Sequence, residues 1–299
     1  MHHELHRHLA RFRTPLIVVG TLLIIARAAG FGSMAMWLAG VVLLLAGIAV
    51  AMVRIGGDPR PATHVRAPVR GRWVPVNSPA DKVPSHGTHE AGQTYAIDLV
   101  YHPDTSVTWR GIRPGTVARR PESFPGFGLP VYAAADGVVV HTGGGQRDHW
   151  SRNSAAGVAY LLVESQVRQL ASMLTLSTAR FLLGNHVVID IGDGVYAVYA
   201  HLRRGSLQVR VGDRVRAGQP LAECGNSGNT SEPHLHFHLM DRARPGTALG
   251  LPFTFDYTTG AGPTTGVPGG TRPFVVPGDG HPDDAAPVPA PVSAEAGDA

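Results

Sequence analysis

The chain has 299 residues, which is room for one large domain or two small ones. Cys224 is its only cysteine, so an intrachain disulfide is excluded. The formal net charge is +4, and nearly all of the positive charge is arginine. Since no aromatic residues are interleaved with a basic stripe, the sequence argues against a nucleic-acid partner.

The N-terminal quarter of the chain predicts a membrane anchor. After a basic, histidine-rich tail at residues 1–13, residues 14–53 are almost entirely apolar. They predict a hairpin of two spans, residues 14–32 and 34–53. The second stretch runs twenty residues without a charge, and a membrane span needs about 20 apolar residues. A single span is the alternative. The lipid bilayer is therefore an expected partner, and the Arg/Pro-rich residues 54–72 predict a linker.

Residues 73–256 predict an all-β domain, an antiparallel sheet or sandwich. Short runs of alternating apolar residues are separated there by Gly, Asp and Pro. An insertion at about 143–183 interrupts this pattern, and its residues 158–176 have the apolar spacing of a helix. This insertion is a candidate surface for an envelope protein partner. Residues 257–299 form a Gly/Pro/Ala-rich tail, for which we expect disorder from about 277.

Three histidines lie on alternate positions near the end of the predicted domain. His234, His236 and His238 are separated by Leu235 and Phe237. Because alternate side chains of a strand share a face, one face of this strand would be imidazole and the other apolar. Histidine is the commonest metal ligand in proteins, so the pattern indicates a zinc site. The alternative is a surface run of histidines without a metal.

These histidines are the last of several motifs that occur in a set order along the chain. They are a His-to-Asp stretch from His86 to Asp98, GLPVYAAADGVVV at 128–140, GNHVVIDIG at 184–192, YAHL at 199–202, VGDRVRAGQPLAECGNSGNT at 211–230 and HLHFH at 234–238. In this order they resemble the lysostaphin/LytM-like zinc peptidoglycan endopeptidases, peptidase family M23. The resemblance covers roughly residues 73–240.

The resemblance implies one zinc ion per chain, with His89, Asp98 and His236 as its ligands. His86 is the alternative to His89, since relatives vary in the spacing between this histidine and the aspartate. The resemblance also implies that His201 and His234 carry the catalysis. One of them takes a proton from water and the other stabilises the oxyanion, and the sequence leaves their order open. His238 is a departure, because relatives usually have an acidic or amide residue there.

The function implied by the resemblance is hydrolysis of peptide cross-links in peptidoglycan by a membrane-anchored metalloendopeptidase. Its substrate would require the catalytic domain to lie outside the cytoplasmic membrane. Arginines on both sides of a two-span hairpin instead favour a cytoplasmic domain under the positive-inside rule. The alternative function is a non-catalytic envelope scaffold or regulator of cell-wall hydrolases with the same fold.

Overall fold

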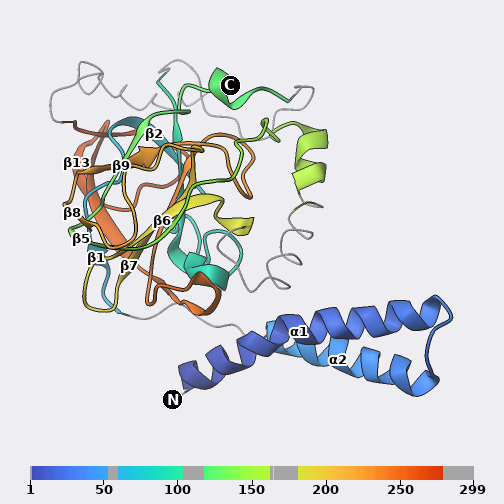
Figure 1. Cartoon of the computed structure of the whole chain (residues 1–299). Helices are drawn as coiled ribbons and strands as arrows, with labels where there is room; N and C mark the ends of the chain where they lie inside the picture. Colours follow the sequence, from blue (N-terminus) through green and yellow to red (C-terminus); the bar gives the residue numbers. More distant parts are fainter. Residues whose placement is uncertain (1, 53–59, 104–117, 162–163, 165–180, 279–299) are drawn as a thin grey trace, which may run out of the picture.

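The computed structural model describes residues 2–52, 60–103, 118–161, 164 and 181–278 (Figure 1). Within these residues, two paired helices precede a mostly β domain with one large sheet and one small sheet. The large sheet contains β1 (Thr63–His64), β2 (Gly71–Val76), β3 (Ile97–Tyr101), β5 (Gly137–Gly143), β6 (Asn185–Asp190), β7 (Tyr196–Leu202), β8 (Arg214–Val215), β10 (Leu235–Met240), β11 (Gly250–Leu251), β12 (Phe253–Thr259), β13 (Gly262–Gly266) and β14 (Phe274–Val276). The small sheet pairs β4 (Pro130–Tyr132) with β9 (Pro220–Glu223).

The large sheet places strands distant in sequence side by side. Its order is β1-β12-β14-β2-β3-β10-β7-β6-β5-β8, with β11 beside β10 and β13 beside β12. The pair formed by β1 and β12 is parallel, and all other pairs of neighbouring strands in this sheet are antiparallel. The mostly β domain expected from the alternating pattern is therefore present, with β10 between β3 and β7.

The two faces of β10 divide the domain into a core side and a polar side. Leu235, Phe237 and Leu239 are fully buried in the main hydrophobic core. That core also contains Trp73 and Tyr199, whose hydroxyl accepts a 2.7 Å hydrogen bond from the Ala134 backbone N–H. The intervening histidines therefore lie on the opposite face of the sheet, as the alternation predicts.

The sheet extends past both expected boundaries of the domain, residues 73 and 256. β1 lies within residues 54–72, which we expected to be a linker. At the other end, β12 runs past residue 256, and β13 and β14 add two further strands. Their buried Phe255 and Phe274 join the core, and this burial offsets the cost of ordering a Gly- and Thr-rich segment. The disorder predicted from 277 falls almost entirely on residues 279–299, outside the described residues.

Helices α1 (His2–Ala28) and α2 (Met34–Met52) form a hairpin beside the β domain (Figure 1). They approach closely at Gly20, where a Cβ atom would lie 2.6 Å from the Leu44 backbone nitrogen. α1 also includes most of residues 1–13, the basic, histidine-rich tail. In the part of the chain that the structure describes, no helix has both the length and the apolar character needed to cross a membrane. The two predicted spans are therefore not supported.

The insertion expected at 143–183 follows β5 directly. Residues 155–161 are helical, and most of the predicted helix at 158–176 lies outside the described residues. The first part of the insertion packs on the loop before β10. Asp148 accepts a 2.7 Å hydrogen bond from the Asn226 backbone N–H, and Asn153 donates one of 3.1 Å to Glu232. This part of the insertion therefore braces the loop that leads to the histidines.

Candidate metal centre

The pairing of β3 with β10 brings a carboxylate and an imidazole together. Asp98 and His236 lie directly opposite each other in the antiparallel register, so their side chains share a face. His236 Nδ1 donates a 2.8 Å hydrogen bond to Asp98 Oδ1. Both side chains are buried. A buried carboxylate is costly unless it is paired or metal-bound, so this pair is the natural centre of a site.

His86 supplies a third ligand atom from the loop before β3. Its Nε2 lies 3.0 Å from Asp98 Oδ2. The ligand atoms of His86, Asp98 and His236 all lie within 4.8 Å of one another. Two imidazole nitrogens and one carboxylate oxygen that converge in this way fit the three-ligand set of a catalytic zinc site.

His89, which we predicted to be the first ligand, occupies a different environment. Its Nδ1 hydrogen-bonds to the Thr94 hydroxyl at 3.1 Å. It lies at the N-terminal cap of the short 3-10 helix η1 (Glu90–Tyr95). The structure therefore brings the alternative histidine, His86, beside Asp98 in its place.

The two histidines expected to carry the catalysis stand next to the ligand set. The rings of His201 and His234 are 4.8 Å apart, and the rings of His201 and His236 are 5.6 Å apart. His201 Nδ1 donates to the Ser227 carbonyl at 2.8 Å, and His234 Nδ1 donates to the Glu232 carbonyl at 2.8 Å. Both rings therefore carry a proton on Nδ1. Nε2 of neutral His201 is then a proton acceptor, whereas Nε2 of His234 lies 3.4 Å from Asp98 Oδ1.

His201 also has an unusual backbone conformation. It ends the regular part of β7 with φ of +62°, in the left-handed region that is rare for residues other than glycine. Such strain persists only where the surrounding structure holds it, and it concentrates at functional sites. Here the Leu183 carbonyl accepts a 2.9 Å hydrogen bond from the His201 backbone N–H. The backbone and the ring are thus fixed from two neighbouring segments.

The electrostatics of the cluster centre on Asp98. Burial alone would raise the pKa of its carboxyl, but the adjacent His86, His234 and His236 together hold that pKa well below its ordinary value. Burial lowers the pKa of His201 well below its ordinary value, and the neighbouring imidazoles lower it further. For His234, burial acts to lower the pKa, but the Asp98 carboxylate and Glu232 together outweigh burial and raise it. The carboxylate is therefore ionised, and His201 is neutral at neutral pH.

Asn77 is a site residue that sequence reasoning missed. Its Nδ2 donates a 2.9 Å hydrogen bond to Asp98 Oδ2 from the turn that follows β2. Asn77 has φ of +48°, a conformation that asparagine tolerates better than most residues. An asparagine before Ser78 and Pro79 is a turn signal in the sequence. That signal does not reveal the carboxylate partner, which depends on the pairing of β2 with β3.

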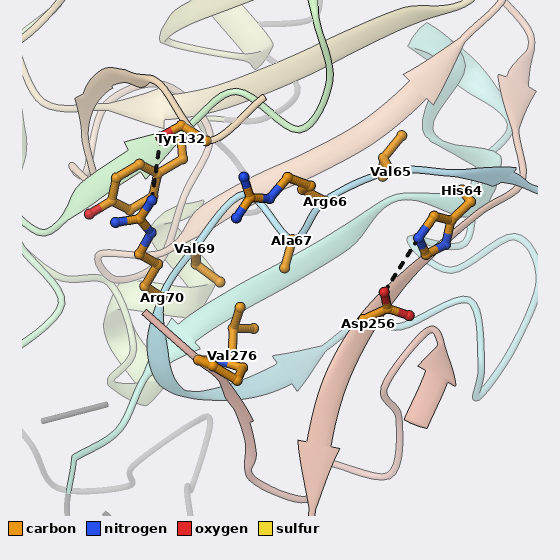
Figure 2. A pocket seen from close by; sticks show the side chains of 11 residues that line it. His64, Val65, Arg66, Ala67, Val69, Arg70, Tyr132, Asp256 and Val276 are labelled. Atoms are coloured by element: carbon orange, nitrogen blue, oxygen red, sulfur yellow. Dashed lines mark hydrogen bonds and ion pairs between the residues drawn. The ribbon is translucent and has the colours of Figure 1, made fainter. Parts of the chain in front are cut away.

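The cavity in Figure 2 lies apart from these imidazoles. It has a volume of about 220 Å³ and is lined by residues 64–70 together with parts of the small sheet, β12 and β14. Its walls combine basic and apolar residues with the acidic Asp256, and the Arg70 guanidinium lies 4.2 Å above the Tyr132 ring. None of the metal-centre residues lines it. The metal-centre residues therefore lie outside this cavity.

Comparison with known proteins agrees with this geometry. The model of "Peptidase family M23" matches residues 164–247, which include His201, His234 and His236. The resemblance to peptidase family M23 is confirmed. The match ends well after His236 but begins after Asp98, so it does not cover the N-terminal half of the ligand set.

Relatives of this chain include two named endopeptidases and a lipoprotein. Peptidoglycan DD-endopeptidase ShyA of Vibrio cholerae is 29% identical over 163 residues, 53% of this chain and 29% of that protein. Glycyl-glycine endopeptidase ALE-1 of Staphylococcus capitis is 36% identical over 80 residues, 26% of this chain and 22% of that protein. The lipoprotein NlpD/LppB homolog of Pseudomonas aeruginosa is 29% identical over 119 residues, 40% of this chain and 28% of that protein. The chain thus spans less than a third of the length of each of these relatives.

Among solved structures, the catalytic domain of lysostaphin from Staphylococcus simulans aligns with this chain with a TM-score of 0.31 and 18% sequence identity. The alignment covers 60% of this chain and 88% of that domain.

Proposed function

We propose that this chain is a zinc metallopeptidase that hydrolyses peptide cross-links of peptidoglycan. The observation that carries the proposal is the convergence of His86, Asp98 and His236, with ligand atoms within 4.8 Å of one another. Two further imidazoles, those of His201 and His234, stand beside this set. The family match supports a peptidase, and the relatives named as peptidoglycan or glycyl-glycine endopeptidases support the substrate class.

Each residue of the centre has a defined part in this reaction. A zinc ion held by His86, Asp98 and His236 would supply the Lewis acidity that lowers the pKa of water and polarises the scissile carbonyl. His201 and His234 both present Nε2, since both rings donate from Nδ1 to backbone carbonyls. One of these two imidazoles accepts the proton of the attacking water and transfers it to the leaving amine. The other donates a hydrogen bond to the oxyanion of the transition state.

The surrounding residues hold these groups in place. Asn77 binds one oxygen of Asp98, which orients the carboxylate toward the two ligand imidazoles. The loop before β10 is braced by Asp148 and Asn153 of the insertion, which restricts the position of His234. Such preorganisation is what positions a water and a peptide for reaction.

Zinc content and product release test the proposal together. We expect wild-type protein to contain one zinc per chain and to release muropeptides from purified peptidoglycan. His236→Ala is expected to lose both zinc and release, whereas His201→Ala keeps zinc and loses release. His64→Ala, a change at an exposed histidine outside the centre, serves as the matched control and retains both. Wild-type protein that neither binds zinc nor releases muropeptides would refute the proposal.

Two substitutions test whether His86 or His89 is the first zinc ligand. His86→Ala is expected to lose zinc, because the His86 ring borders Asp98. His89→Ala is expected to keep zinc, because its ring bonds to Thr94. The reverse result would assign the ligand role to His89.

A non-catalytic regulator of cell-wall hydrolases is the competing function. Relatives include an NlpD/LppB homolog and a protein named as a cell division protein, DipM of Caulobacter vibrioides. The full set of ligand and acid–base side chains in this chain favours hydrolysis. A cell phenotype that survives His201→Ala but is lost on deletion of residues 158–176 would favour the regulator instead.

The peptidoglycan substrate also has a consequence for location. We propose that the β domain works in the cell envelope, outside the cytoplasmic membrane, where such a substrate lies. Protease added to intact spheroplasts should then cleave the β domain. Protection of the domain from that protease would contradict this location.

A further inference from the structure

His238 lies on the same face of β10 as the ligand His236. It is fully buried, and its Nδ1 lies 3.1 Å from His236 Nε2. The two rings are 5.2 Å apart and nearly perpendicular, at 77°. His236 is thereby held between two partners, with Asp98 at its Nδ1 and His238 at its Nε2.

The role of this contact follows from how an imidazole binds a metal. A ring nitrogen that binds a metal carries no proton, so the neutral ring keeps its proton on the other nitrogen. His236 faces Asp98 with Nδ1, so a metal held beside Asp98 would be bound by Nδ1, which leaves Nε2 to carry the proton. That Nε2–H is buried and requires an acceptor, and His238 Nδ1 is in position to accept it.

We propose that His238 is a positioning residue of the metal centre. Its Nδ1 accepts the hydrogen bond of His236 Nε2–H and holds His236 in the tautomer and orientation that present Nδ1 to zinc. This inference rests on the proposed function. Partners of this kind raise the metal affinity of a histidine ligand because they fix its ring and its proton.

Histidine is suited to this position because it can give or accept the shared proton. In the metal-free centre, His236 Nδ1 donates to Asp98, so the contact between the two histidines is donated by His238 Nδ1–H. With a metal held at Nδ1, His236 would carry its proton on Nε2 and neutral His238 would carry its own proton on Nε2 instead of Nδ1, so the same contact would be donated by His236. The hydrogen bond therefore persists in both states, and only its direction changes.

The second nitrogen of His238 leaves the ring able to make this change. Its Nε2 is buried without a hydrogen bond of standard geometry among the described residues, and the backbone of Ala91, in η1, interacts with the ring. The ring is also held in place by close packing. Gly92 has φ of +75°, and a Cβ atom on it would lie 3.4 Å from His238 Nε2 and 2.8 Å from the Met240 Cβ. The turn of η1 thus covers the ring closely.

Two substitutions separate the hydrogen bond from packing. His238→Gln keeps a side chain that can both donate and accept, whereas His238→Met fills a similar volume without a strong acceptor. Zinc affinity is measured by competition with a chelating dye, without reference to peptidase activity. We expect His238→Met to lose about 10- to 100-fold in zinc affinity. We expect His238→Gln to stay close to wild type, as does the control His64→Met at an exposed histidine.

The outcomes distinguish this inference from the proposed function. If wild-type protein binds zinc and His238→Met binds it equally tightly, the inference is overturned while the zinc site stands. Equal losses in His238→Met and His238→Gln would also overturn it, since packing would then explain both. Absence of zinc binding by wild-type protein overturns the proposed function itself.

A measurement on wild-type protein covers the case in which a variant does not fold. Nitrogen NMR shifts of the zinc-loaded protein report which ring nitrogen of His236 is protonated. The proposal expects the proton on Nε2, with a scalar coupling across the hydrogen bond to His238 Nδ1. An Nε2 proton without that coupling would exclude His238 as the acceptor.

Discussion

Acidification should destabilise the metal-free protein through His186, a histidine outside the metal centre. His186 lies on β6 and is buried. Its Nδ1 donates a 2.7 Å hydrogen bond to the Gly184 carbonyl, and its Nε2 lies 2.9 Å from His141 Nδ1. Burial, with a smaller contribution from the adjacent His141 ring, lowers the pKa of His186 from 6.5 to about 4, although the Gly184 carbonyl acts to raise it.

The direction of the effect follows from where protons bind. The folded-state pKa lies below the unfolded-state value, so the unfolded chain takes up the proton first as the pH falls. The contribution of neutral His186 to stability is therefore complete above about pH 6.5. It is lost as the pH falls toward the folded-state value of about 4. One pKa unit corresponds to about 1.4 kcal/mol, so the loss at pH 4.5 is about 2.5 kcal/mol.

Urea denaturation of chelator-treated protein measures this loss. The free energy of unfolding is compared at pH 7.5 and pH 4.5 for wild type and for His186→Gln, which cannot titrate. The decrease between the two pH values should be smaller in His186→Gln by about 2.5 kcal/mol. His64→Gln, at an exposed histidine, should decrease as wild type does. Equal decreases in wild type and His186→Gln would refute the link between burial of this ring and acid sensitivity.

Three other changes test the core, the electrostatics and the loop before β10. Tyr199→Phe leaves the buried backbone N–H of Ala134 without its acceptor, and it should lower the free energy of unfolding by about 1–3 kcal/mol in urea denaturation. Asp98→Asn should lower the pKa of His234 in the metal-free protein, as followed by NMR titration; an unchanged value would contradict the pairing. Gly228→Ala places a Cβ 2.4 Å from a backbone nitrogen at φ of +80°, so we expect lower Tm and weaker muropeptide release; wild-type values would show that the loop adapts.

Much of the site could be predicted from local sequence pattern. Strict alternation of His and apolar residues predicted a strand with two different faces, and Phe237 is indeed in the core while His236 lies opposite. Asp98 was recognisable as a polar residue within an apolar strand. These inferences held because the period of two in a strand is a property of the backbone and needs no knowledge of neighbouring strands.

The domain boundaries were less accessible to sequence. Strands β12 to β14 contain Gly and Thr and follow the last recognisable motif, so composition alone suggested a tail. Phe274 is buried on β14, which pairs with β2 across about two hundred residues of sequence. A pairing of that kind has no local signal.

The sequence by itself determined which residue types could form the centre: histidines on alternate positions of one strand and an aspartate on another. Only the tertiary structure decided which histidine of the preceding loop joins them. His86 and His89 are three residues apart in an irregular segment, where no periodicity assigns a side to either ring. The path of that loop against β3 puts the His86 ring at Asp98 and the His89 ring at Thr94. Ligand sets assembled from separate segments depend on chain path and strand register, which only long-range packing fixes.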